Sequence, residues 1–358
     1  MLSILDKYII KKFLSTFFFM LGVIMLLAVV FDVSERLSEF IDNEAPLSEI
    51  LGKYYVNFIL YFGNMFSSMI VFLSVIWFTA KMAQETEIIP ILNSGKPFNR
   101  FLRPYFISAT FLLLISLLLN HLVLPLSNKN RLGFEEDYYR NAMHVSDYYA
   151  EFPGNQIVYF KSFSAIDSLI KDFVVEKWTP EKEMVSFIKA RSAKNIHGTN
   201  KWVLTDVFER HCGQEGDSIE MHKLLNKTFD FKITDVATRE NAVEAMTYSE
   251  LTEFIKKESD KGSALIPNYK IELYQRTSLP FATYVLTVIG VAVASRKKRG
   301  GIGVNIAIGL GFVFIYIFAM KVMAVTALNV GFPPMIAVWV PNILFAGVAY
   351  VLYRKAMR

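Results

Sequence analysis

Residues 13–31 read FLSTFFFMLGVIMLLAVVF and carry no charged side chain. Because about 20 apolar residues are enough to cross the hydrocarbon core of a bilayer, this run predicts a membrane-spanning helix. It lacks a small-residue cleavage site and acidic residues follow it directly, so we do not interpret it as a cleaved signal peptide. Five further runs are apolar over a similar length: 54–80, 104–126, 277–295, 302–326 and 335–353. The sequence therefore predicts six transmembrane helices.

The overall composition agrees with a membrane protein. Of the 358 residues 53% are hydrophobic, and the mean hydropathy is +0.34, which is too apolar for an ordinary soluble domain. The net charge of +5 does not indicate nucleic-acid binding, because the basic residues collect at the ends of the apolar runs. The single cysteine, Cys212, excludes an internal disulfide and a cysteine-based zinc site.

The basic residues predict how the helices are oriented. They precede the first run, lie between the second and third and between the fourth and fifth runs, and end the chain: Lys7, Lys11, Lys12, Lys81, Lys96, Arg100, Arg103, Arg296, Lys297, Lys298, Arg299, Arg354, Lys355 and Arg358. Residues 32–53, on the other side, hold six acidic and only two basic residues. Since positively charged connections face the cytoplasm, we expect both termini there and the long segment after the third run outside.

That long segment predicts a separate β domain. It contains short runs of β-favouring residues separated by turn-forming residues. These runs are 157–160, 173–175, 184–188, 202–204 and 229–233. Such strands are typical of a sandwich or jelly roll, either closed on itself or open enough to pair with another chain or hold an acyl chain. One helix over 249–257, begun by Thr247 or Ser249, closes the domain.

The predicted fold class is therefore a membrane α-helical protein with six transmembrane helices and an inserted extracytoplasmic all-β domain that resembles a jelly roll. Residues 1–128 form the first three membrane helices, with a short cytoplasmic helix at about 84–95. Residues 129–266 form the β domain, and residues 267–358 form the last three membrane helices.

The sequence offers no catalytic motif. It has no phosphate-binding loop, and its five histidines lack metal-ligand spacing, so we expect neither an ATP site nor a metal site in this chain. Ion-coupled transporters place charged residues within their spans, whereas here only His121 and Lys321 lie within the apolar runs. An external energy source is therefore favoured over an ion gradient.

Residues 83–104, AQETEIIPILNSGKPFNRFLRP, connect the second and third runs and form neither a span nor a simple loop. Apolar residues recur at helical spacing, so we expect a short helix that begins near Ile88 or Ile89 and ends at Gly95. Such a cytoplasmic helix is suited to docking a permease onto a nucleotide-binding subunit. The alternative is a helix that lies flat on the membrane, with its basic side toward anionic lipid.

Several stretches resemble the lipopolysaccharide export permease family (LptF/LptG, also YjgP/YjgQ). They are EIIPILNSG (87–95) with Arg100 and Pro104, LDKYII (5–10), ELYQR (272–276) with Pro280, GFPP (331–334) and WVPN (339–342). Within the insert only WVLTD (202–206) and the helix after Thr247 are similar to the family. The acidic residues after Phe31 favour the LptG type.

This resemblance implies an inner-membrane permease of a Gram-negative bacterium that extracts lipopolysaccharide. Two such subunits pair and recruit an ATP-binding cassette ATPase dimer, which binds the ATP and magnesium. The insert passes the lipid to periplasmic jelly-roll bridge proteins, and the first and fifth spans line the lipid cavity. By position, the coupling helix that meets the ATPase contains Glu85, Glu87, Ile88, Ile91, Leu92 and Gly95.

The chain departs from the LptG type at the outer end of the first span, where the family carries basic residues. This sequence has Asp32, Glu35, Arg36 and Glu39 there. We take Lys321, Arg36 and Arg276 as candidates to bind lipid phosphates at the headgroup level. The alternative for each is snorkelling to the interface or pairing with an acid. An acidic cavity mouth suggests a lipid with fewer phosphates or one bridged by a divalent ion.

Three other functions remain open from the sequence. A lipid transporter that works without an ATPase would be active alone. A membrane-anchored enzyme would need a cluster of catalytic residues in the insert, and none stands out. A scaffold with a periplasmic binding domain would not depend on Glu87.

Overall fold

The computed structural model describes residues 3–93, 97–138, 144–152, 154–164, 169–196, 199–213, 216–229, 240–263, 265–296 and 301–357. These residues form two compact units. The helical unit contains residues 1–134, 244–248 and 267–358, and the sheet unit contains residues 135–243 and 249–266.

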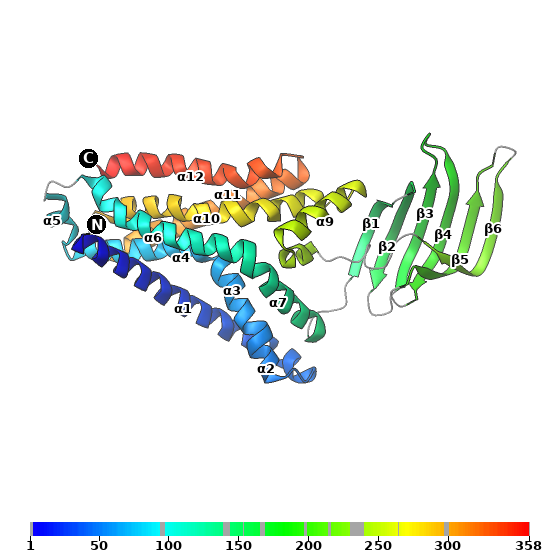
Figure 1. The fold of residues 1–358 in the computed structure, drawn as a ribbon, viewed down its shortest axis with the longest axis horizontal. Coiled ribbons are helices and arrows are strands. Elements are labelled where there is room, and N and C mark those ends of the chain that lie inside the picture. The colour runs from blue at the N-terminus through cyan, green and yellow to red at the C-terminus, as the bar shows by residue number, and fades with distance from the viewer. Residues whose placement is uncertain are drawn as a thin grey trace. The chain divides into compact units, whose positions relative to one another are not determined.

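The helical unit is built from long apolar helices. They are α1 (Ile4–Asp42), α2 (Leu47–Glu49), α3 (Val56–Met65), α4 (Ser67–Gln84), α5 (Ile88–Asn93), α6 (Phe98–Leu118), α7 (Leu124–Tyr138), α10 (Ile266–Ala294), α11 (Gly301–Asn329) and α12 (Pro334–Ala356). Among the described residues, six helices are long and apolar enough to cross a membrane, which confirms the predicted number of spans. Both termini and α5 lie at the same end of this unit, called the terminal end below (Figure 1).

The helix boundaries differ from the predicted runs in two places. The second run is divided at Phe66 into α3 and α4, and a π-helical turn over Ile50–Tyr55 precedes it. The third helix continues from α6 through a π-helical turn, Leu119–Val123, into α7. The predicted break between the last two spans is confirmed, because α11 ends before Gly331, whose φ of +71° strongly favours glycine.

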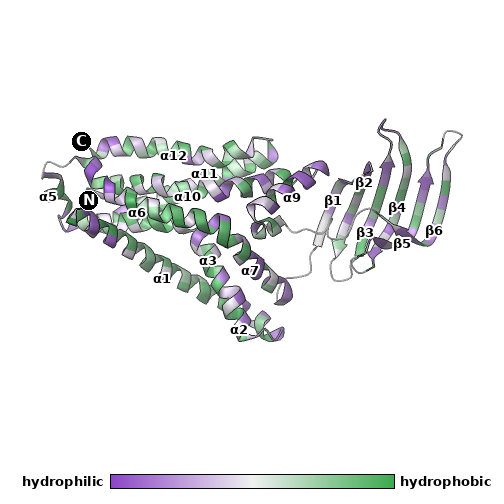
Figure 2. Ribbon diagram, viewed as in Figure 1, coloured by the Kyte–Doolittle hydropathy of each residue, from purple (hydrophilic) through white to green (hydrophobic). Residues whose placement is uncertain are grey.

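Helix α4 is the centre of the helical unit. In its 18-residue apolar stretch 61% of the residues are buried, and the helix packs against α1, α3 and α11. Helix α10 also comes very close to it, because a Cβ added to Gly290 would lie 2.9 Å from Cγ1 of Val75. In the corresponding apolar stretches of α1 and α11 only 17% and 22% of the residues are buried. Figure 2 shows that α1 is nevertheless apolar over most of its length, and α11 contains a single charged residue, Lys321. They therefore expose apolar surface to lipid or to another chain.

The sheet unit contains six antiparallel strands, each paired with the next in the chain. They are β1 (His144–Phe152), β2 (Gln156–Ser164), β3 (Leu169–Trp178), β4 (Met184–Asn195), β5 (Lys201–His211) and β6 (Ser218–Thr228). Buried residues of these strands form one core, which includes Phe160, Phe173 and Trp202. The predicted inserted all-β domain is confirmed, and its described strands form a single sheet with a sequential order.

The sheet contains strands that the pattern did not predict. Four predicted runs lie in β2, β3, β4 and β5, whereas the fifth, 229–233, falls outside the described residues except for Phe229. Strands β1 and β6 were missed because they carry charged and polar residues, and most side chains of β6 are exposed. The predicted helix over 249–257 is confirmed as α9 (Tyr248–Asp260).

Candidate functional site

The short helix α5 lies between α4 and α6 at the terminal end. Its start at Ile88 agrees with the prediction, while Gly95, its predicted end, lies outside the described residues. Helix α4 ends in a turn in which the amide of Glu87 donates to the carbonyl of Met82 at 2.9 Å. Thr86 occupies the left-handed position of this turn, with φ of 60°, where glycine is usual. A β-branched residue is strained there, so the turn that directs Glu87 is held by its surroundings.

The Glu87 carboxylate is bound by the first helix. The hydroxyl of Tyr8 in α1 donates a hydrogen bond to Glu87 Oε2 at 2.9 Å, and Lys12 Nζ lies 3.7 Å from Glu87 Oε1. The Lys12 ammonium also lies 4.6 Å from the centre of the Tyr8 ring. The start of α1 therefore holds the turn that leads into α5.

A second ion pair joins α1 to α6. Arg100 donates two hydrogen bonds to the Asp6 carboxylate, at 2.6 and 2.7 Å. Asp6 is only 1% exposed and also closes a capping box with Ser3, whose hydroxyl accepts from the Asp6 amide. We name Asp6, Tyr8, Lys12, Glu87 and Arg100 the clasp. It joins two motif stretches, 5–10 and 87–100, that are far apart in the sequence.

Packing against the helical unit decides which face of α5 is available to a partner. Ile88 is 2% exposed, and Ile91 packs against the same core, so these two residues fix α5 to its own bundle. Ile89 and Pro90 are exposed on the other side. Of the remaining predicted coupling residues, Glu85 pairs with Lys81 at 3.9 Å, and Leu92 belongs to the helix. The predicted set of coupling residues was therefore partly wrong about exposure: it contains the buried Ile88 and omits Ile89 and Pro90, which are exposed.

The three candidate phosphate ligands have different surroundings. Lys321 is exposed on α11 and has no ion pair with any described residue. Arg36 is paired with Asp32 at 3.2 Å and with Glu39 at 3.5 Å. Asp32 additionally accepts hydrogen bonds from Tyr54 and Tyr55. Arg36 is thus paired with acidic residues, which was the alternative to phosphate binding considered from the sequence. The ammonium group of Lys321, by contrast, is open to a ligand.

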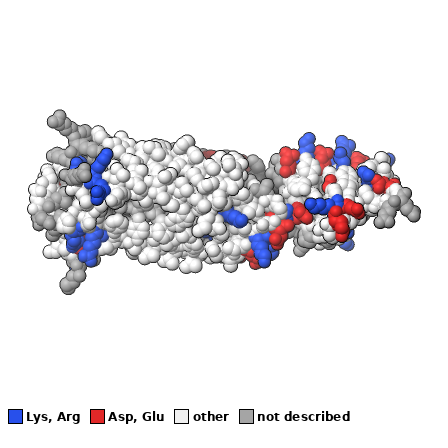
Figure 3. All heavy atoms as spheres, turned by 90° about the horizontal axis from the view of Figure 1, so that it is seen from above, with Lys and Arg blue, Asp and Glu red and all other residues white. Residues whose placement is uncertain are grey.

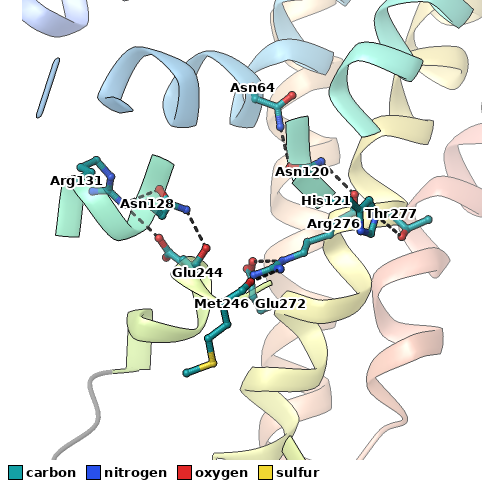
Figure 4. Close-up of polar contacts among 10 residues, drawn as sticks. All are labelled: Asn64, Asn120, His121, Asn128, Arg131, Glu244, Met246, Glu272, Arg276 and Thr277. Atoms are coloured by element: carbon teal, nitrogen blue, oxygen red, sulfur yellow. Dashed lines mark hydrogen bonds and ion pairs between the residues drawn. The ribbon is translucent and has the colours of Figure 1, made fainter. Parts of the chain in front are cut away.

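Arg276 lies within a polar network, shown in Figure 4. It is 5% exposed, and its guanidinium donates to the Met246 carbonyl at 2.7 Å and to Glu272 at 3.1 Å. Asn120 donates to the carbonyl of Arg276 at 3.1 Å and accepts from Asn64 at 2.8 Å. In this conformation Arg276 binds groups of its own chain.

The same network fastens the segment that returns to the helical unit after the sheet. The Glu244 carboxylate lies 3.4 Å from Arg131, and the Glu244 carbonyl accepts from Asn128 at 3.1 Å. Because Met246 is held by Arg276, residues 244–246 are bonded to both α7 and α10. A cavity of about 110 Å³ adjoins this network, lined by Asn64, Asn120 and Arg276 among others. The network therefore anchors the connection from the β domain to the membrane helices.

No group of three metal-ligating side chains occurs in the part of the chain that the structure describes. Cys212 is a free, partly exposed thiol that follows β5.

Comparison with known proteins identifies the family. The profile of the lipopolysaccharide export system permease LptF/LptG matches residues 7–355. No curated protein matches the sequence significantly. The family match does not distinguish the LptG type from the LptF type. Since it covers nearly the whole chain, and the six apolar helices and the inserted antiparallel sheet agree with it, this protein belongs to the LptF/LptG family of lipopolysaccharide export system permeases.

Proposed function

We propose that this chain is one of two permease subunits whose lipopolysaccharide extraction is driven by a cytoplasmic ATP-binding cassette ATPase. As a permease of the export system, it is a transport component rather than an enzyme. The observation that carries the proposal is α5, a helix held by the clasp with Ile89 and Pro90 exposed. A rigidly attached helix transmits a partner's motion to the helices that hold it, here α1, α4 and α6.

In this proposal the terminal end faces the cytoplasm of the inner membrane. The basic residues of α6 and α12 and at the start of α1 lie at this end, as expected for cytoplasmic ends of spans. The β domain then lies in the periplasm, where it receives the lipid and passes it to jelly-roll bridge proteins. Strand β6 supports this role, because its exposed apolar side chains, including Met221 and Leu224, offer a surface for a neighbouring strand or an acyl chain.

The lipid path follows the two least buried helices. Helices α1 and α11 expose apolar side chains such as Phe19, Phe31, Phe314 and Phe318. We assign these faces to the second permease subunit and to the acyl chains of the lipid. To Lys321, which is exposed on α11, we assign the binding of a lipid phosphate as a point charge.

Co-purification in mild detergent tests the proposal. The wild-type chain should retain an ATP-binding cassette protein and a second six-helix permease, identified by mass spectrometry. Ile89→Glu places a charge on the exposed face of α5 and should remove the ATPase while the second permease is retained. Met357→Glu, which adds the same charge at another exposed apolar site of the terminal end, serves as the control. Wild-type protein that transports lipid while purifying alone would overturn the proposal in favour of an ATPase-independent transporter.

A further inference from the structure

An apolar groove of about 420 Å³ lies among α6, α10 and α12. Its floor includes Leu102 and Ala349, which are 4% and 5% exposed, and its walls include Phe106, Tyr284 and Tyr350. The hydroxyl groups of two lining tyrosines form hydrogen bonds with side chains of the same chain. The Tyr284 hydroxyl bonds Thr110 at 2.8 Å, and the Tyr353 hydroxyl donates to Asn99. The interior of the groove is therefore suited to a hydrocarbon chain.

The groove opens on the membrane-facing surface of the helical unit. Tyr350 is 60% exposed and Phe106 is 38% exposed, and α6, α10 and α12 each belong to a helix that is apolar enough to span a bilayer. In the bilayer this surface is covered by acyl chains rather than by water, because exposing apolar walls to water is unfavourable. The groove occupies the half of the helices nearest the terminal end, since it is lined by the first turns of α6 and the last turns of α12.

Basic residues lie near the terminal end of the helices that line the groove. The guanidinium carbon of Arg354 lies 5.9 Å from the centre of the Tyr350 ring, which forms a wall of the groove. Arg296 donates to the Lys355 carbonyl at 2.9 Å, which brings two more cations together. Arg103 is exposed on α6, one turn before Phe106. Figure 3 shows basic side chains at this end of the helical unit, beside a long uncharged surface.

These cations are not neutralised by the helices that carry them. Neither α6 nor α12 contains an acidic residue, and the one acid of α10, Glu272, lies in the half of that helix away from the groove. Arg103, Arg296, Arg354 and Lys355 form no ion pair with any residue that the structure describes. An apolar groove with an uncompensated basic rim matches the two parts of an anionic phospholipid.

We propose that this groove binds one anionic phospholipid of the leaflet at the terminal end, separate from the transported lipid. One acyl chain lies between Phe106 and Tyr350, and the phosphate is bound by Arg354, whose planar guanidinium can donate two parallel hydrogen bonds. The bound lipid bridges α6 and α12, which flank the groove. The inference uses the membrane location of the chain and does not depend on how α5 binds its partner.

Native mass spectrometry of the full chain, purified with its natural subunits, tests this inference. The probes are phosphatidylglycerol and phosphatidylcholine with identical oleoyl chains, titrated in the same detergent. We expect the wild type to bind phosphatidylglycerol about tenfold more tightly, and Arg354→Gln to lose that preference. Ala346→Phe fills the groove from an exposed lining position and should abolish the adduct of both lipids.

Two controls match these variants. Lys11→Gln removes an exposed cation of the same end but from α1, and Val351→Phe adds the same ring to a face of α12 outside the groove. Both should bind as the wild type does. Equal binding of the two lipids by the wild type would overturn the headgroup assignment, and an unchanged adduct in Ala346→Phe would overturn the groove assignment. Displacement of phosphatidylglycerol by lipopolysaccharide would assign the groove to the transported lipid and also overturn the proposal.

Discussion

The ion pair between Asp6 and Arg100 predicts how firmly α1 holds the segment that contains α5. Asp6→Asn keeps the size of the side chain but replaces one carboxylate oxygen with an amide nitrogen, which cannot accept from Arg100. One of the two charge-assisted hydrogen bonds is lost, and such a bond contributes about 1.5–3 kcal/mol. Because the Arg100 side chain is 29% exposed and regains some hydration, we expect a loss of about 2 kcal/mol. This corresponds to about a 30-fold change in the opening equilibrium.

Hydrogen–deuterium exchange of the purified complex measures this change. Amides in the second and third turns of α1 should exchange about 30-fold faster in Asp6→Asn, and those of α5 should follow because Tyr8 and Lys12, which hold Glu87, lie on these turns. Lys81→Gln is the control, since it breaks only the exposed pair with Glu85 and should change exchange by no more than about fivefold.

A double-mutant cycle decides whether the contact itself is responsible. If Asp6→Asn and Arg100→Gln act through one shared interaction, the double variant should be hardly worse than either single variant. Effects that simply add, or exchange at the wild-type rate in Asp6→Asn, would refute the view that this pair holds the start of α1.

Four further predictions follow from other parts of the chain. Lys321→Gln should weaken lipopolysaccharide binding several-fold in a titration with the purified complex, and unchanged affinity would exclude it as a phosphate ligand. Arg276→Leu should lower the Tm, since it removes the hydrogen bonds that the guanidinium donates to the Met246 carbonyl and to Glu272, and a hydrogen bond to a charged group contributes about 1.5–3 kcal/mol; an unchanged Tm would show that the network does not stabilise the fold. Gly290→Val should destabilise the bundle by about 1–3 kcal/mol through overpacking against Val75, whereas the exposed Gly22→Val should not. Cys212, the single cysteine, should react with a membrane-impermeant maleimide added from the periplasm, and protection until the inner membrane is opened would reverse the proposed orientation.

The sequence by itself determined the six spans and the inserted β domain. Length and hydropathy are properties of contiguous residues, and a bilayer requires each spanning segment to satisfy its own backbone hydrogen bonds. Local turn residues were equally informative, as at Gly331 between the last two spans. The pattern failed for β1 and β6, because strands with charged and exposed side chains have no apolar signal that distinguishes them from loops.

The candidate site was predicted only in part, because its contacts join residues that are distant in the sequence. Asp6 and Arg100 were both recognised within separate motifs, yet only the folded chain shows that they form one ion pair. The helical pattern of 88–92 could not tell which side of α5 faces the bundle, since apolar residues lie on both sides. Tertiary packing decided this by burying Ile88 and leaving Ile89 exposed. Tertiary packing also decided that Arg276 binds a group of its own chain, because the Met246 carbonyl that accepts its hydrogen bond belongs to the segment that follows the inserted sheet in the sequence.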